Sequence, residues 1–94
     1  SENSKNLLVL DLSANKIGDK GALAIANSPH LSKLKTLDLY NNQITEKGMR
    51  ALLNSKYLKS LELLVLVRNE INPDKMDDLA KSKTLPSLRR LEMF

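Results

Sequence analysis

Few side chains in this sequence of 94 residues could carry acid–base or metal chemistry. It has no cysteine, which excludes disulfides, thiolate nucleophiles and zinc–thiolate sites. His30 is the only histidine, so a metal site with several histidines cannot form. Asp11 and Asp38 occupy equivalent positions of a repeat, so we expect them to be neighbours. Two neighbouring carboxylates can raise the pKa of one of them, and such a pair can act as acid and base. No nucleophile or glycine-rich phosphate loop accompanies them, so we expect neither enzyme activity nor a cofactor.

The charge balance raises the question of nucleic-acid binding. Lys and Arg number 15 against 11 Asp and Glu, a net charge of +4. Basic residues expected on helices and their connections are Lys47, Arg50, Lys56, Lys59, Lys81 and Lys83. Acids expected to interrupt them are Glu46, Asp74, Asp77 and Asp78. Aromatic residues for base stacking make up only 3% of the chain, which argues against a nucleic-acid partner.

The hydropathy pattern divides the chain into a polar segment, residues 1–6, and one domain, residues 7–94. The opening segment does not resemble a signal peptide. No stretch reaches the roughly 18–20 apolar residues that cross a bilayer, so we expect no membrane association. These features favour a cytoplasmic location.

Leucines recur every 27 residues, and the repeating unit reads Leu-x-x-Leu-x-Leu-x-x-Asn-x-Ile. The equivalent positions are Leu7, Leu34, Leu61, Leu88; Leu10, Leu37, Leu64, Leu91; Leu12, Leu39, Leu66, Met93; Asn15, Asn42, Asn69; and Ile17, Ile44, Ile71. A repeat of this size cannot bury its own apolar side chains, so we expect successive repeats to stack.

Each repeat changes its spacing part-way along. Alternation, as in residues 37–40, predicts a strand, and later steps of three and four predict helices over 19–27, 46–54 and 73–81. The candidate N-cap residues of these helices are Gly18, Thr45 and Asn72. Each is followed by an acid in the first turn of its helix: Asp19, Glu46 and Asp74. Serines expected to bond backbone groups at the helix ends are Ser28, Ser55 and Ser82.

The asparagine positions have a structural interpretation. A side-chain amide both donates and accepts hydrogen bonds. At the bend after each strand, we expect Asn15, Asn42 and Asn69 to bond the loop backbone of their own and adjacent repeats, and not a ligand.

Residues 7–94 resemble the leucine-rich repeat family, best seen in the stretch from Leu10 to Gly18. The second halves of the repeats are helical and contain Gly21 and Gly48, and in this they resemble the ribonuclease-inhibitor-like subclass. Their residue pattern is also similar to that of repeats in bacterial arrays. The resemblance implies an α/β fold, a right-handed solenoid with a parallel sheet on its concave face and three helices on its convex face. It also implies a protein-binding scaffold that is not a catalyst.

About three and a half repeats are present: 7–33, 34–60, 61–87 and a partial 88–94. The third departs from the pattern because Lys75 replaces the glycine, so its helix start is expected to differ. No capping unit is recognisable at either end, and three repeats is near the minimum for stability. We therefore expect either a piece of a longer array or a chain that covers its ends by self-association.

Alternation along the strands predicts which side chains line the concave surface. The third strand is the most apolar there, and charges surround it. The predicted partner-binding residues are Tyr40, Leu63, Val65, Val67, Arg68, Asp38, Arg90 and Phe94. Exposed apolar patches with polar rims are typical of protein interfaces. The alternative is that these residues reflect β-propensity alone, or that another segment covers them.

The size of the surface limits what it can bind. Four strands about 4.8 Å apart span only ~15 Å, whereas a standard interface buries about 800 Å² on each partner. The sequence predicts a weakly bound protein or a peptide of unknown identity. A structural, self-associating solenoid that uses its edge strands is the alternative function.

Overall fold

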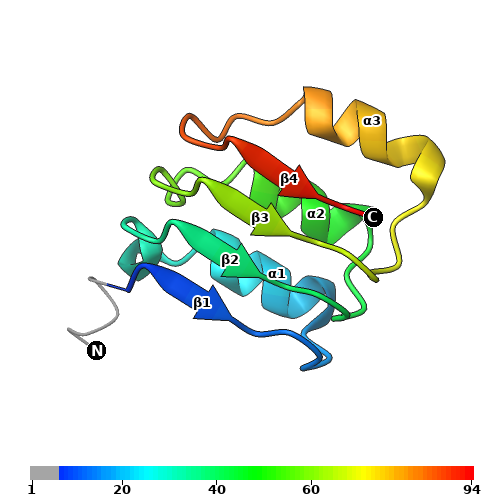
Figure 1. Ribbon diagram of the computed structural model, residues 1–94, viewed down its shortest axis with the longest axis horizontal. Helices are drawn as coiled ribbons and strands as arrows, with labels where there is room; N and C mark the ends of the chain where they lie inside the picture. The colour runs from blue at the N-terminus through cyan, green and yellow to red at the C-terminus, as the bar shows by residue number, and fades with distance from the viewer. Residues whose placement is uncertain (1–6) are drawn as a thin grey trace.

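The computed structural model describes residues 7–94. Each repeat contributes a short strand and, in the first three repeats, a helix that returns the chain to the start of the next strand (Figure 1). The strands are β1 (Val9–Asp11), β2 (Thr36–Asp38), β3 (Leu63–Val65) and β4 (Arg90–Glu92). The helices are α1 (Gly18–Ala26), α2 (Glu46–Leu53) and α3 (Pro73–Lys81), with a 3-10 turn at Pro29–Leu31.

The four strands form one parallel sheet in the order β1-β2-β3-β4. Its register follows the sequence repeat, so that Leu10, Leu37, Leu64 and Leu91 lie side by side. Parallel neighbours need a crossover connection, and a helix supplies each one. In the view of Figure 1, α1 and α2 lie behind the sheet and α3 lies above β4. This arrangement confirms the predicted α/β solenoid, and the predicted helix bounds agree to within one residue.

The apolar core lies between the sheet and the helices. Leucines of the two inner strand layers are fully buried: Leu34, Leu37, Leu39, Leu61, Leu64 and Leu66. The equivalent residues of the first and last layers are only partly buried: Leu7, Leu10, Leu12, Leu88, Leu91 and Met93. Equivalent positions of different repeats thus differ in burial. The inner layers have a neighbouring repeat on both sides, whereas the first and last layers have one on a single side.

The asparagines bond to the preceding repeat, as predicted. The Asn42 Oδ1 accepts from the backbone N–H groups of Asn15 and Ile17, at 2.8 and 3.2 Å. Its Nδ2 donates to the Leu12 carbonyl at 2.8 Å. Asn69 repeats this pattern on the second repeat. Asn42 is fully buried, and its hydrogen bonds satisfy polar groups that would otherwise destabilise the core.

Two of the three predicted N-cap residues, Thr45 and Asn72, occupy that position, and Gly18 does not. Gly18 is the first residue of α1 and has φ +67°, so it is not the N-cap. Thr45 is the N-cap of α2, but its hydroxyl donates to the Asp19 carboxylate instead of capping its own helix. Only Asn72 caps with its own side chain, accepting from the Asp74 N–H at 2.9 Å.

Asp19 was expected to stabilise its own helix, and it contacts the start of the next one instead. Its Oδ1 accepts from the N–H groups of Thr45 and Gly48, at 2.7 and 3.1 Å. The cap of α2 therefore comes from the first repeat. Burial raises the pKa of Asp19, but the hydrogen bonds from Thr45 and Gly48 and the charge of Lys47 outweigh it, so the pKa is lowered.

Two of the serines behave as predicted. The Ser55 hydroxyl donates to the Ala26 carbonyl at 2.5 Å, which joins the loop after α2 to the end of α1. The Ser82 hydroxyl donates to the Leu79 carbonyl at 3.0 Å. For Ser28, the hydrogen bonds of the described residues include none from its side chain.

Candidate functional site

The sheet has one face against the helices and one face without them, which we call the open sheet face (Figure 1). Side chains alternate along each strand, so the leucines that point into the core are separated by residues on the open sheet face. In β3, Leu64 is buried, whereas Leu63 and Val65 on either side of it are partly exposed.

Apolar side chains gather on the open sheet face around β3. Leu63, Val65 and Val67 are each half-buried. The Leu39 N–H donates to the Val65 carbonyl and the Asn41 N–H donates to the Val67 carbonyl, each at 2.9 Å. These bonds continue the pairing beyond β2 and β3, so Tyr40 lies beside Val67. Tyr40 is 37% exposed and provides the aromatic ring of this cluster.

Asp38 lies beside Val65 in the register of the sheet, and its side chain has a local partner. Its Oδ1 accepts from the Tyr40 N–H at 3.0 Å. The equivalent Asp11 accepts from the Ser13 N–H at 3.0 Å. Hydrogen bonds from the Ser13 backbone and side chain lower the pKa of Asp11. Adjacent carboxylates can raise a pKa, but the pKa of Asp11 is lowered because these local donors dominate.

The two arginines of the predicted site differ in setting. Arg90 lies beside Leu63, and its Nε is 2.7 Å from the Glu92 carboxylate on the same strand. Arg68 is exposed in the turn after β3 and has φ +60°. The equivalent residues Ala14 and Asn41 have the same left-handed backbone, with φ values of +58° and +57°. This turn therefore holds the Arg68 side chain at the rim of the open sheet face.

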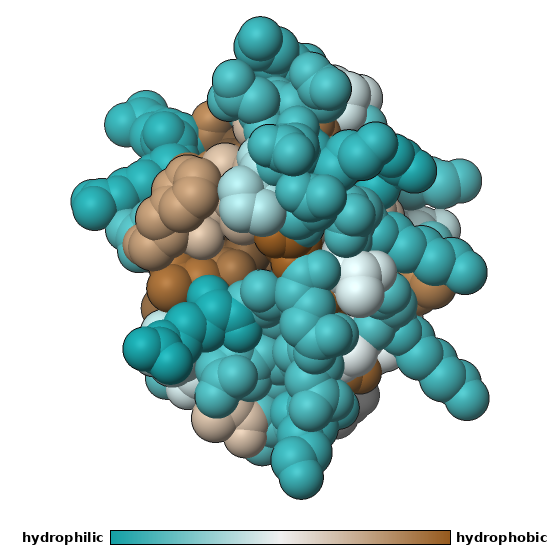
Figure 2. Space-filling view, turned by 90° about the vertical axis from the view of Figure 1, so that its right-hand side faces the viewer, coloured by the Kyte–Doolittle hydropathy of each residue, from teal (hydrophilic) through white to brown (hydrophobic). Residues whose placement is uncertain are grey.

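Phe94 is 87% exposed, so most of its ring does not pack on the sheet. Figure 2 views the edge at which the strands end, with the open sheet face on its left. Hydrophobic side chains gather at the left of that view, and hydrophilic ones surround them. Tyr40, Val67 and Phe94 follow the ends of β2, β3 and β4, at this same edge.

Two exposed apolar residues, one just before β1 and one in it, were not singled out from the sequence. Leu8 is 51% exposed and Val9 is 59% exposed. A signal for Leu8 was available, because Lys35, Glu62 and Arg89 occupy its position in the other repeats. Val9 places an exposed apolar side chain on the open sheet face at the outer strand, beside Thr36, whereas Leu8 lies at the edge where the strands begin.

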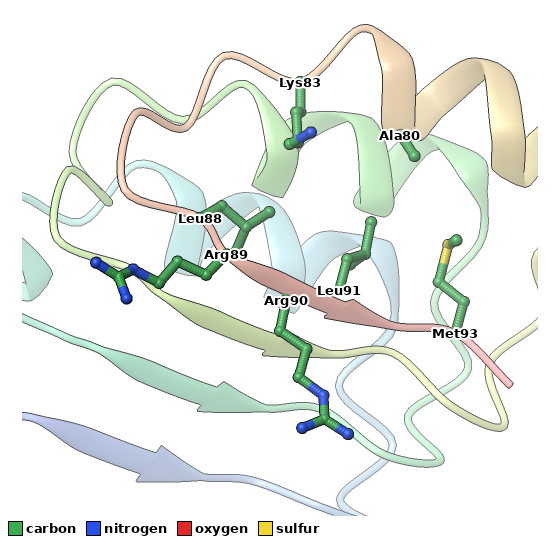
Figure 3. A pocket seen from close by; sticks show the side chains of 7 residues that line it. All are labelled: Ala80, Lys83, Leu88, Arg89, Arg90, Leu91 and Met93. Carbon is green, nitrogen blue, oxygen red and sulfur yellow. The ribbon is translucent and has the colours of Figure 1, made fainter.

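A cleft of about 210 Å³ opens between β4 and α3 (Figure 3). It is lined by Ala80, Lys83, Leu88, Arg89, Arg90, Leu91 and Met93. Leu91 and Met93 point toward the helix layer, whereas Arg90 points away from it. Pockets for small molecules usually exceed about 300 Å³, so this cleft suits a single side chain better than a cofactor.

The described residues offer little else for chemistry. Within residues 7–94, no group of three or more histidine, aspartate or glutamate side chains could hold a metal ion. None of the helices described there is long and apolar enough to cross a bilayer. The predicted cytoplasmic location stays a prediction.

These features define a repeat protein of the strand–helix solenoid class, with an apolar patch on its open sheet face. The family model described as Leucine Rich repeat matches residues 3–26 and 30–53. The chain therefore belongs to the leucine-rich repeat family. A separate search of the curated proteins found no match. Leucine-rich repeats are generally protein-interaction modules and are typically not enzymes.

Proposed function

We propose that this chain is a non-catalytic module that binds a protein or peptide through the open sheet face. The observation that supports this is the apolar cluster around β3. Leu63, Val65 and Val67 occupy positions that alternate with buried leucines, yet they remain partly exposed. Contiguous exposed apolar side chains are typical of interaction sites.

The charged neighbours of this cluster support an oriented mode of binding. Arg90 and Glu92 form an ion pair on one side, and Asp38 lies on the other. Charged groups around an apolar centre contribute more to specificity than to affinity. Tyr40 and Arg68 are the best candidates for a large share of the binding energy, because tyrosine and arginine are enriched among hot spots.

The dimensions of the sheet favour a peptide as the bound partner. A four-strand sheet spans roughly 15 Å, and a standard interface needs about 800 Å² per partner. An extended segment lying across the strands can contact Tyr40, Val67 and Leu63 without needing a larger surface. We also propose membership of the ribonuclease-inhibitor-like subclass, which the helices of the first three repeats support.

Alanine substitutions with peptides selected against the wild-type chain test this proposal. Peptides from a displayed library are enriched on the intact chain, and their affinities are measured by fluorescence anisotropy. We expect Tyr40→Ala combined with Val67→Ala to weaken binding by about tenfold or more, because truncated hot spots cost about 2 kcal/mol. Leu8→Ala is the control, since Leu8 is an exposed apolar residue outside the open sheet face.

Equal affinities for the wild type and the double variant, with unchanged folding by circular dichroism, would remove the open sheet face from consideration. The self-associating function that the sequence also predicts stays a prediction. Light scattering over a range of protein concentrations tests it, because association through the ends would raise the apparent mass with concentration.

A further inference from the structure

The fold separates the charges of this chain between the two edges of the sheet. The segments from the end of each helix to the next strand are residues 27–35, 54–62 and 81–89, where Lys81 is the last residue of α3, and they stack at the left of Figure 1. We call these segments the basic edge. They contain seven basic residues and one acid: Lys33, Lys35, Lys56, Lys59, Lys81, Lys83, Arg89 and Glu62.

The opposite edge has a different balance. The segments between the strands and the helices, residues 13–19, 40–46 and 67–74, contain two basic residues and four acids: Lys16, Arg68, Asp19, Glu46, Glu70 and Asp74. Asp19 and Glu46 lie in the first turns of α1 and α2. Of the acids that interrupt the basic residues in the sequence, Glu46 and Asp74 lie at this opposite edge, whereas Asp77 and Asp78 lie on α3.

Helix dipoles do not account for this distribution. The negative ends of the helices lie at the basic edge and attract cations, but the effect falls off within the last turn. Of the seven basic residues, only Lys81 lies inside a helix. The other six belong to the connecting loops and the positions next to the strands, and all of them are exposed.

Hydrogen bonds between repeats hold the basic edge in place. The Glu62 N–H donates to the Lys35 carbonyl at 2.8 Å, and the Arg89 N–H donates to the Glu62 carbonyl at 2.9 Å. These three residues therefore lie on neighbouring strands. The Thr84 N–H donates to the Leu53 carbonyl at 3.0 Å, which joins the loops that carry Lys56 and Lys83. The side chains of this edge project from an ordered backbone.

Glu62 is the single acid among the described segments of the basic edge, and Asp77 and Asp78 precede Lys81 on α3. Within residues 7–94, the ion pair of the basic edge joins Lys35 to Glu62 at 3.7 Å, and both side chains are about half exposed. Lys83 and Arg89 lie above and below the cleft at the start of β4 (Figure 3). Like charges held this closely on one surface repel each other, and an anionic partner relieves that repulsion.

We propose that the basic edge binds an acidic protein segment, at a surface separate from the open sheet face. A protein segment fits better than a nucleic acid for two reasons. Glu62 lies in the middle of the row, where it would oppose a uniform phosphate backbone, whereas a protein segment can present a hydrogen-bond donor to it. The ring nearest the row of lysines, Tyr57, is half-buried and offers little surface for stacking a base.

The experiment uses a fluorescein-labelled peptide of alternating glutamate and serine, at low ionic strength, with fluorescence anisotropy as the readout. A peptide of alternating glutamine and serine is the uncharged control. We expect the glutamate peptide to bind the intact chain and to dissociate as salt is added, because exposed charges are screened. The glutamine peptide should not bind.

Two triple variants locate the binding surface. Lys56→Gln, Lys83→Gln and Arg89→Gln together neutralise the basic edge, and we expect affinity to fall by about tenfold or more. Lys20→Gln, Lys47→Gln and Arg50→Gln together remove the same charge from exposed helix positions outside that edge, and they should change affinity by less than about twofold. Tyr40→Ala should leave this binding unchanged, which separates it from the function proposed for the open sheet face.

Three results would overturn the proposal. The first is the absence of glutamate-peptide binding at low salt. The second is an equal loss of affinity in both triple variants, which would indicate attraction to net charge alone. The third is a single-stranded DNA oligonucleotide that binds more tightly than the peptide and depends on the same three basic residues, which would assign the edge to nucleic acid.

Discussion

The two junctions between neighbouring helices are built differently, although the sheet beneath them is regular. At the first junction, α2 packs closely against α1, and Gly48 faces Ala22 and Asp19. A Cβ on Gly48 would lie 2.6 Å from the Asp19 Oδ1 and 3.1 Å from the Ala22 Cβ. At the second junction, α3 packs less closely against α2, and Lys75 stands at the position equivalent to Gly48.

The source of the helix cap differs in the same way. Asp19 of the first repeat caps α2, whereas Asn72 caps α3, its own helix. The asparagine bonds are the same at both junctions, with Asn42 at the first and Asn69 at the second. The strands and asparagines therefore set the stacking of the repeats, and the helix layer has room to vary around them.

The largest expected effect comes from filling the close junction. Gly48→Leu places a side chain where a single Cβ already overlaps Asp19 and Ile44. We expect it to lower the free energy of unfolding by about 3 kcal/mol, since overpacking separates the helices and disrupts the cap. Urea denaturation measures this change. Lys75→Leu is the matched control and should change stability by less than about 0.5 kcal/mol, because Lys75 is exposed. Similar losses in both variants would mean that the two junctions are equally tight.

A smaller effect is expected from removing the cap that crosses the first junction. Asp19→Ala should lower stability at neutral pH by about 1.5 kcal/mol, because the N–H groups of Thr45 and Gly48 lose their acceptor. The pKa of Asp19 is lowered in the folded chain, so the carboxylate stabilises the fold above its ordinary value of 3.8. That contribution is lost as the pH falls below 3.8 toward the folded-state pKa.

Thermal unfolding of the wild type and Asp19→Ala across this pH range tests the assignment. The difference between their stabilities should shrink as the solution is acidified below pH 3.8. A constant difference from neutral to strongly acidic pH would contradict a role for the charged carboxylate.

The smallest effect belongs to the second junction. Asn72→Ala removes one hydrogen bond, to the exposed Asp74 N–H, and should lower stability by about 1 kcal/mol or less. Because α3 caps itself, the loss should be confined to this helix. Amide hydrogen exchange should accelerate in α3 and stay unchanged in α1. Faster exchange in both helices would show that the second junction couples the repeats as tightly as the first.

The sequence predicted the repeats, the strand register and the helix positions. Similar residues that recur at a constant spacing take the same place in each repeat, so the repeats stack in register. It also predicted the partners of Asn42 and Asn69, since an amide at a buried bend needs backbone partners. The candidate site was predicted from the alternation along the strands together with the 27-residue period. The adjacency of Tyr40 and Val67 follows from that period, whereas the high exposure of Phe94 does not, because it depends on how little of the sheet lies beside the ring.

The left-handed turns were not predicted. Ala14, Asn41 and Arg68 share a positive φ, and only asparagine among them favours that backbone. Their conformation arises because the chain must leave the strand and reach the helix in a fixed number of residues.

The sequence by itself determined the stacking of the repeats, because the 27-residue period brings identical side chains into neighbouring layers whatever the detail of the connections. Only the tertiary structure decided that Asp19 caps the helix of the next repeat and that the lysines and acids separate onto opposite edges. The cap depends on residues of neighbouring repeats meeting across an interface. The separation of charges depends on the parallel sheet, which places all strand starts at one edge and all strand ends at the other.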